Sequence, residues 1–330
     1  MKYIFSLLLL LVITVLALFA SQLIGMFLIA IVYDIPIIEF TNQMQNMSAH
    51  PELRTPILIL QGFTQIFSFL GAALFFTKYV YKFNQANPNN GTVHVMNPDL
   101  AQQFLEEPFL RRYKTPAFIF LVVVVLAIVA FPAVWVTGAL NGAVEFPEAL
   151  KGLETWMREK EDAAQTLTLF MTDFASPMQA ILGFIVVAIL AGLTEEVFFR
   201  GVVQPLFQNL TKNKHAAIWI TAIIFSAIHF QFYGFIPRML LGALFGYLYI
   251  YTNNITVPIW AHILNNGLTL ILFLFVDKEM LNAPAMETND FATMIPLGIL
   301  SILLCVGILK FIQKQMNKKV EEVVEGKKSW

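Results

Sequence analysis

The sequence predicts an all-α polytopic membrane protein with about eight transmembrane helices and both termini in the cytoplasm. Three observations predict this fold: the composition, long uncharged runs, and the distribution of lysine and arginine. Of the 330 residues, 58% are hydrophobic and only 13% are charged, and the mean hydropathy is +0.69. Soluble domains average roughly 45–50% apolar and 25% charged residues, so lipid must be the solvent for much of the surface. The formal net charge of −1 gives no basic balance that would indicate nucleic acid as a partner.

A spanning helix needs about 20 largely apolar residues. The first three predicted spans are the uncharged runs 3–33, 55–77 and 115–144. The first run resembles a secretory signal at its start, but its apolar stretch continues to Tyr33. This exceeds the apolar core of a signal peptide, roughly 7–15 residues, so we expect an uncleaved span.

The second half of the chain supplies five more predicted spans. The fourth runs from Pro177 to about Asn209, and the fifth covers 215–230. The uncharged stretch 239–276 is too long for one span, and polar residues at 252–254 followed by Pro258 divide it into a sixth and a seventh. The eighth runs over about 291–312.

Lysine and arginine in short connections predict the orientation. Basic residues gather in the second connection, the fourth connection and the C-terminal tail, which fall on one side if there are eight spans. Acidic residues concentrate in the connections on the other side. We therefore expect residues 1–330 to form a single membrane domain, with extramembrane connections at 81–115 and 141–175. Charges mixed with Leu, Phe and Trp at helical spacing favour interfacial helices in these connections, although ordinary solvated loops are an equal alternative.

Ionisable side chains at membrane depth cost roughly 2.5–3.5 kcal/mol on insertion, so they face the bundle interior and mark function. They occur here in three spans, at Glu195, Glu196, Arg200, His229 and His262. Glu196 and Arg200 are four residues apart and share a helix face. Glu195 points about 100° away from Glu196, so the two carboxylates need not do the same job.

Asn266 joins this polar group, because it shares a helix face with His262 at the same four-residue spacing. Glu196 lies 18 residues before Lys214, and His229 lies 17 residues after Lys212, so their depths agree. His262 is only 8 residues past Asn254, which predicts a position nearer the cytoplasmic surface.

Each polar residue also has a structural interpretation. Glu196 and Arg200 would form a structural ion pair, His229 would be a packing residue, and Asn266 would hydrogen-bond a neighbouring helix. Taken together, an acid, two imidazoles and an amide on three helices favour a catalytic site.

The same residues resemble the motifs of the CAAX protease and bacteriocin-processing family, also called CPBP or Abi. Residues 195–201 (EEVFFRG) resemble its EExxxR motif, 225–229 (FSAIH) its FxxxH motif, and 262–266 (HILNN) its HxxxN motif. The three occur in the family order within roughly seventy residues, and the resemblance covers a catalytic core at about 178–275.

The resemblance implies an intramembrane glutamic endopeptidase of the Rce1-like kind in a bacterial cell membrane. Glu195 and His229 would position and deprotonate a water, while His262 and Asn266 would stabilise the oxyanion. The supporting residues would be Glu196, Arg200 and Phe225. A carboxylate in a low-dielectric pocket gains basicity, which suits the role of Glu195.

Two alternatives remain open at this point. Two histidines and a glutamate are also a catalytic zinc set, although the chain has no HExxH and its single cysteine, Cys305, supports neither a disulfide nor a cysteine-based zinc site. The polar cluster would otherwise belong to a non-catalytic immunity or scaffold protein. We expect no cofactor and no metal. The expected partners are a membrane-associated protein or peptide substrate and the bilayer, and the sequence specifies neither the substrate nor the oligomeric state.

Overall fold

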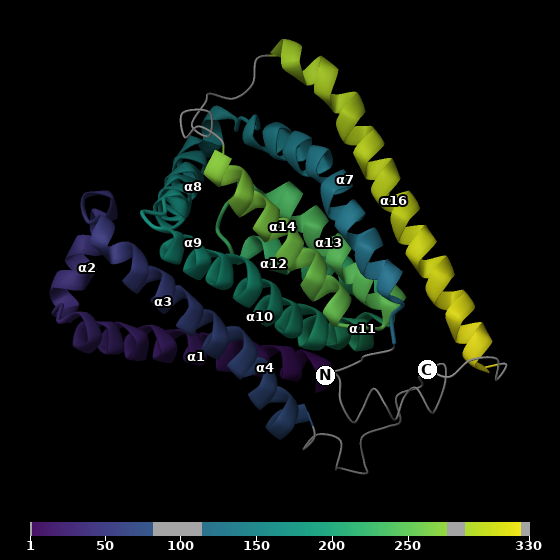
Figure 1. Ribbon diagram of the computed structural model, residues 1–330, viewed down its shortest axis with the longest axis horizontal. Coiled ribbons are helices and arrows are strands. Elements are labelled where there is room, and N and C mark those ends of the chain that lie inside the picture. The colour runs from purple at the N-terminus through teal and green to yellow at the C-terminus, as the bar shows by residue number, and fades with distance from the viewer. Residues whose placement is uncertain (1, 82–113, 276–287, 325–330) are drawn as a thin grey trace. The chain divides into compact units, whose positions relative to one another are not determined.

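A computed structural model describes residues 2–81, 114–275 and 288–324, and within these ranges the secondary structure is helical, with no extended strand (Figure 1). Among the described residues, seven helices are long and apolar enough to cross a membrane, and the shorter apolar helix Lys214–Ala227 corresponds to the remaining predicted span. The all-α polytopic prediction is therefore confirmed. The cytoplasmic position of the termini stays a prediction.

The chain divides into two compact units. Unit 1 comprises Met1–Arg111 and Phe170–Asn213, and unit 2 comprises Arg112–Leu169 and Lys214–Trp330. The predicted connection at 81–115 lies almost wholly outside the described residues. In the connection at 141–175 the structure has a helix, α8, over Lys151–Thr172.

Unit 1 contains the following elements: α1 (Lys2–Tyr33), α2 (Ile37–Gln45), the 3₁₀ turns η1 (Met47–Ala49) and η2 (Pro51–Leu53), α3 (Arg54–Gln65), the π-helical η3 (Ile66–Gly71), α4 (Ala72–Phe75), the π-helical η4 (Phe76–Tyr81), α9 (Pro177–Gly183), the π-helical η6 (Phe184–Leu190), α10 (Ala191–Phe198), the π-helical η7 (Phe199–Val203) and α11 (Gln204–Thr211). The run Pro177–Thr211 is continuously helical, in agreement with the predicted fourth span.

Unit 2 contains α7 (Ala117–Gly142), the 3₁₀ turn η5 (Glu148–Leu150), most of α8, α12 (Lys214–Ala227), α13 (Phe235–Thr252), α14 (Thr256–Phe275) and α16 (Thr288–Val324). The division of 239–276 into two spans is correct, because Asn253 adopts a left-handed conformation (φ 46°) and ends α13.

Close packing within unit 1 supports the helix that carries the glutamates. A Cβ atom at Gly62 of α3 would lie 3.2 Å from Val186 and 3.3 Å from Leu190 of η6, so the small residue permits this close approach. The start of α3 is anchored by Arg54, whose Nε donates to the Phe170 carbonyl at 2.7 Å and whose Nη2 pairs with Asp173 at 2.9 Å.

In unit 2, α7 and α16 lie side by side (Figure 1). Pro132 lies inside α7, where a proline removes a helical hydrogen bond and strains its surroundings. Next to it, Ser301 of α16 accepts from the Ala133 amide at 3.1 Å and donates to the Val129 carbonyl at 2.5 Å. The hydroxyl thus bridges two groups that would bond directly in a regular helix, and it fixes the register of the two helices.

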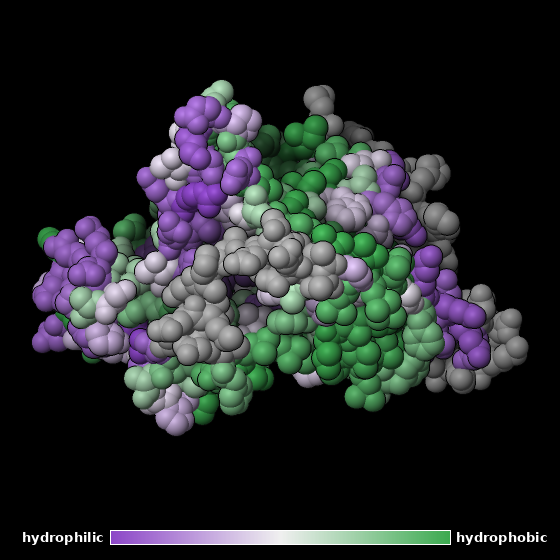
Figure 2. Space-filling model, turned by 90° about the horizontal axis from the view of Figure 1, so that it is seen from above, coloured by the Kyte–Doolittle hydropathy of each residue, from purple (hydrophilic) through white to green (hydrophobic). Residues whose placement is uncertain are grey.

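The apolar core of unit 2 combines α7, α13, α14 and α16. Its buried members are Ile119, Val123, Leu126, Phe245, Leu248, Val257, Ala261, Leu309, Ile312 and Met316. On the surface shown in Figure 2, hydrophobic residues form broad continuous areas and hydrophilic residues gather in separate clusters. Large exposed apolar areas are uncommon on soluble monomers and mark contact with lipid or protein. The chain is an integral membrane protein.

Candidate active site

The two predicted glutamates lie on α10, in a fully packed part of unit 1. Glu196 is 0% exposed and Glu195 is 8% exposed, so the latter retains a small accessible surface. Neighbours on the same helix are also buried, including Thr194 and Phe198. Carboxylates are rarely buried without partners that compensate for lost hydration. The two carboxylates thus differ in exposure, and the assignment of separate roles to them stays a prediction.

Glu196 forms a buried ion pair with Arg200, as the four-residue spacing predicts. The Arg200 Nη1 to Glu196 Oε1 distance is 2.8 Å, and both side chains are 0% exposed. Arg200 lies in η7, two residues after the end of α10, and it also interacts electrostatically with Glu195. π-Helical segments are frequent at functional sites. Here one such segment precedes α10 and another follows it, and both alter the rotation of neighbouring side chains around the helix axis.

His229 lies outside the helix that the sequence predicted for it. α12 ends at Ala227, and residues 228–234, which we call the His229 loop, connect it to α13. The chain leaves the helix because Phe230 has a left-handed backbone conformation, with φ 53°. This conformation is uncommon for a residue with a side chain.

The proton position on His229 follows from its hydrogen bond. Its Nδ1 lies 2.7 Å from the backbone carbonyl of Phe225. A carbonyl oxygen can only accept, so Nδ1 carries the proton and, in the neutral ring, Nε2 keeps the lone pair. Nε2 is therefore the nitrogen that can accept a proton.

Phe225 lies beside two of the imidazoles of unit 2. Its ring lies edge-on to His229, with centroids 5.1 Å apart, and edge-on to His262, with centroids 6.0 Å apart. His229 and His262 also interact electrostatically. The two histidines thus both lie against one aromatic ring. The depth of His262 in the membrane stays a prediction.

His262 is held by aromatic packing and is 4% exposed. Its ring stacks on Phe245 of α13, with centroids 5.0 Å apart and an interplanar angle of 24°. Phe245 lies outside the three motifs, and no pattern in the sequence indicated it.

Asn266 lies one turn after His262 on α14. Its Oδ1 accepts a hydrogen bond from Asn265 Nδ2 at 3.2 Å. This hydrogen bond restrains the rotation of the Asn266 amide, so that Oδ1 faces Asn265 and the Nδ2 donor faces away from it. This arrangement suits a residue whose job is to donate a hydrogen bond.

The structure therefore groups the predicted residues within each unit. Unit 1 brings together Glu195, Glu196 and Arg200, and unit 2 gathers Phe225, His229 and His262, with Asn266 one helical turn beyond His262. Within the described residues, no three His, Cys, Asp or Glu side chains form a group able to hold a metal ion.

Comparisons with known proteins agree with the motifs. Residues 177–268 match the family of type II CAAX prenyl endopeptidases, Rce1-like. The chain is 33% identical over 82 residues to the uncharacterized protein YpbD of Bacillus subtilis (strain 168). The aligned segment covers 24% of this chain and 39% of YpbD. It is 32% identical over 109 residues to the membrane-embedded CAAX protease MroQ of Staphylococcus aureus (strain USA300), which covers 31% of this chain and 43% of MroQ.

The aligned segments span about two fifths of the length of these curated relatives. No solved structure matches the chain significantly. The matched range 177–268 contains all three motifs, so the family resemblance predicted from them is confirmed. The comparisons support a membrane protease with bacterial relatives.

Proposed function

We propose that the chain is an intramembrane glutamic endopeptidase that hydrolyses a peptide bond of a membrane-associated protein or peptide. The observation that carries the proposal is the agreement of the family match over 177–268 with the buried polar groups of α10 and unit 2. Buried acids and imidazoles in a membrane protein are costly and mark functional sites, and the proposed mechanism uses both.

In this proposal Glu195 and His229 activate one water molecule. The Glu195 carboxylate accepts one proton from the water, whose oxygen attacks the scissile carbonyl, and the Nε2 lone pair of His229 takes over that proton. The proton then passes to the leaving amine as the C–N bond breaks. General acid–base steps of this kind contribute roughly 10²–10⁴-fold each.

His262 and Asn266 supply donors to the oxyanion of the tetrahedral intermediate. Aromatic packing restrains the His262 ring, and Asn265 orients the amide of Asn266, so both donors are set before the reaction begins. Preorganised donors of this kind are worth about 2.7–4 kcal/mol each in better-studied hydrolases.

Glu196 and Arg200 have a supporting role. Because Arg200 is paired with Glu196 at 2.8 Å, its charge is compensated locally and does not fully neutralise Glu195. This arrangement leaves Glu195 as the carboxylate whose basicity is available for the chemistry.

The test compares membrane peptides and protein termini between cells that make the wild-type protein and cells that make Glu195→Gln at equal abundance. We expect particular termini to disappear in the variant and their uncleaved precursors to accumulate. The matched control is Glu159→Gln, the same change at an exposed position of α8. A variant that leaves every terminus in place would overturn the proposal, and full activity after treatment with a strong chelator would separate the glutamic from the zinc mechanism.

A further inference from the structure

The His229 loop is held by side chains from outside the matched range 177–268. Its local contacts include a hydrogen bond from Ser226 Oγ to the Phe235 carbonyl at 2.7 Å and bonds from Arg238 to Gln231, at 2.6 Å to Oε1 and at 3.4 Å to the carbonyl. The left-handed Phe230 follows His229 directly, and a non-glycine residue keeps such a conformation only when its surroundings enforce it. Side chains of α7 and α8 contact the loop two and three residues beyond Phe230.

The last turn of α7 bridges the end of the loop and the start of α13. Asn141 Nδ2 donates to the Phe232 carbonyl at 3.1 Å, and Asn141 Oδ1 accepts from the Ile236 amide at 2.7 Å. The Ile236 amide belongs to the first turn of α13, whose N–H groups have no intrahelical partner. One amide side chain therefore satisfies a donor and an acceptor, and it fixes where α13 begins.

Helix α8 contacts Phe232 and Tyr233, near the end of the loop. Glu161 Oε2 accepts from the Tyr233 amide at 2.9 Å, the Arg158 guanidinium lies 4.5 Å from the Tyr233 ring centroid, and Trp156 packs on Phe232 with centroids 5.2 Å apart. A hydrogen bond from a backbone amide to a carboxylate is among the stronger kinds. It acts four residues after His229.

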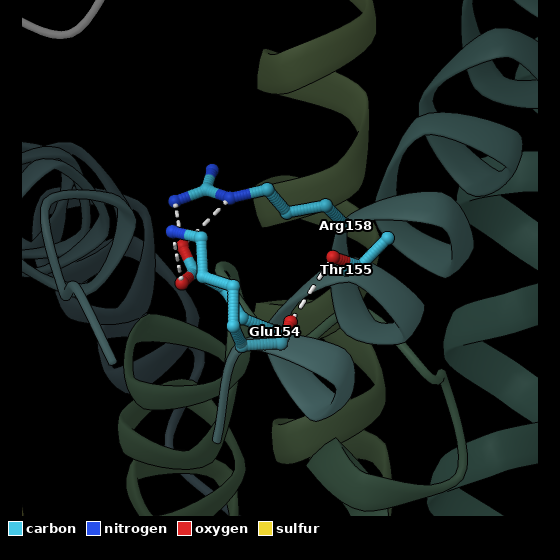
Figure 3. A network of polar contacts seen from close by, with 4 residues as sticks. Glu154, Thr155 and Arg158 are labelled. Carbon is cyan, nitrogen blue, oxygen red and sulfur yellow. Dashed lines mark hydrogen bonds and ion pairs between the residues drawn. The ribbon is translucent and has the colours of Figure 1, made fainter. Parts of the chain in front are cut away.

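A buried carboxylate in turn holds Arg158. Glu154 is 3% exposed, and its Oε1 accepts from Arg158 Nε at 3.0 Å and Nη2 at 2.8 Å, as Figure 3 shows. Its second oxygen, Oε2, accepts from Lys151 Nζ at 3.0 Å. The face of α8 that meets the loop is thus internally braced.

We infer that Glu161 and Asn141 are positioning residues for His229: they hold residues 228–234 so that the imidazole keeps its place beside Phe225. The inference rests on the proposed function, because it assigns His229 a catalytic role. The two side chains would not touch the substrate. They act on His229 through the backbone of the loop, and small displacements of a catalytic group are known to cost up to about 10²-fold in rate.

The test uses Glu161→Ala and Asn141→Leu, which remove the hydrogen bonds, together with the conservative Glu161→Gln, whose amide oxygen can still accept from Tyr233. Purified proteins in lipid are assayed with the substrate identified from the terminus comparison. We expect a loss of about 10-fold in kcat with little change in KM for the first two variants. Glu161→Gln should restore most of the activity, and the exposed Glu159→Ala should match the wild type.

Hydrogen exchange supplies a readout that does not depend on activity. Peptides covering 228–236 should exchange faster in Glu161→Ala and Asn141→Leu than in Glu159→Ala. If Glu161→Gln is as inactive as Glu161→Ala, Glu161 takes part in proton transfer and the positioning role is wrong. If Glu161→Ala and Asn141→Leu keep full kcat while Glu195→Gln and His229→Ala are inactive, the positioning role fails alone. If Glu195→Gln and His229→Ala also keep full activity, the proposed function fails.

Discussion

α10 and the His229 loop each carry one member of the proposed catalytic pair, but the contacts that hold them differ. Glu195 lies within a continuous helix, and the buried pair of Glu196 and Arg200 lies beside it. His229 lies two residues beyond a helix end, on a loop held by side chains more than seventy positions away in sequence. The difference teaches that changes near Glu195 act on stability as well as catalysis, while changes around His229 act on catalysis with less effect on folding.

The largest expected effect on stability is at the buried ion pair. Glu196→Ala leaves the Arg200 charge buried without its 2.8 Å partner, and removal of one member of such a pair typically costs about 3–5 kcal/mol. Unfolding in mixed detergent micelles measures this cost. His229→Ala, by comparison, should shift the unfolding free energy little. If Glu196→Ala and His229→Ala lower the unfolding free energy equally, α10 and the His229 loop do not differ in their contribution to stability.

The next effect tests the donors assigned to unit 2. Asn266→Leu should lower kcat by about 10²–10³-fold, as removal of an oxyanion donor does elsewhere. Asn265→Leu removes only the group that orients Asn266 and should cost less. Steady-state kinetics of both variants measure the order. A larger loss from Asn265→Leu than from Asn266→Leu would contradict the assignment.

Two carboxylates of α8 should give opposite pH dependences of stability. Hydrogen bonds from Arg158 and then Lys151 lower the pKa of Glu154, so its contribution is present above the ordinary glutamate pKa, about 4.3, and is lost as the pH falls through the lowered value. The pKa of Glu161 is raised, and burial is the largest cause. The hydrogen bond from the Tyr233 amide and the charge of Arg238 lower this pKa, and the charge of Asp162 raises it. Its contribution is therefore present at low pH and is lost as the pH rises through the raised value.

The measurement is the unfolding free energy of wild type, Glu154→Gln and Glu161→Gln across this pH range. As the pH falls, the stability of the wild type relative to Glu154→Gln should decrease, and its stability relative to Glu161→Gln should increase. If the two stability differences change with pH in the same direction, the pKa values of Glu154 and Glu161 are not shifted in opposite directions.

The smallest effect concerns the backbone beside His229. Phe230 is 57% exposed and has φ 53°, so Phe230→Gly removes strain of about 1 kcal/mol without loss of core packing. We expect activity within a few-fold of the wild type. Phe230→Val, whose branched side chain resists this conformation, should lower kcat more at similar protein abundance. If Phe230→Gly lowers kcat more than Phe230→Val does, the left-handed conformation at residue 230 does not determine the conformation of the loop.

The sequence was sufficient where local rules decide the structure. Apolar runs and the polar break at 252–254 predicted the helices, and four-residue spacing predicted the pair of Glu196 and Arg200. It was insufficient where distant side chains decide. Nothing near His229 indicates that the helix ends at Ala227, since 215–230 reads as one apolar run. The side chains that form hydrogen bonds with the loop backbone, Asn141 and Glu161, belong to other helices.

A double-mutant cycle on kcat/KM tests whether Glu195 and His229 act on the same water. Wild type, Glu195→Gln, His229→Ala and the double variant are compared in lipid with one validated substrate. Residues that act as a unit are strongly non-additive, so the double variant should be no slower than the slower single variant. Losses that multiply, or a single variant with full activity, would contradict a shared catalytic step.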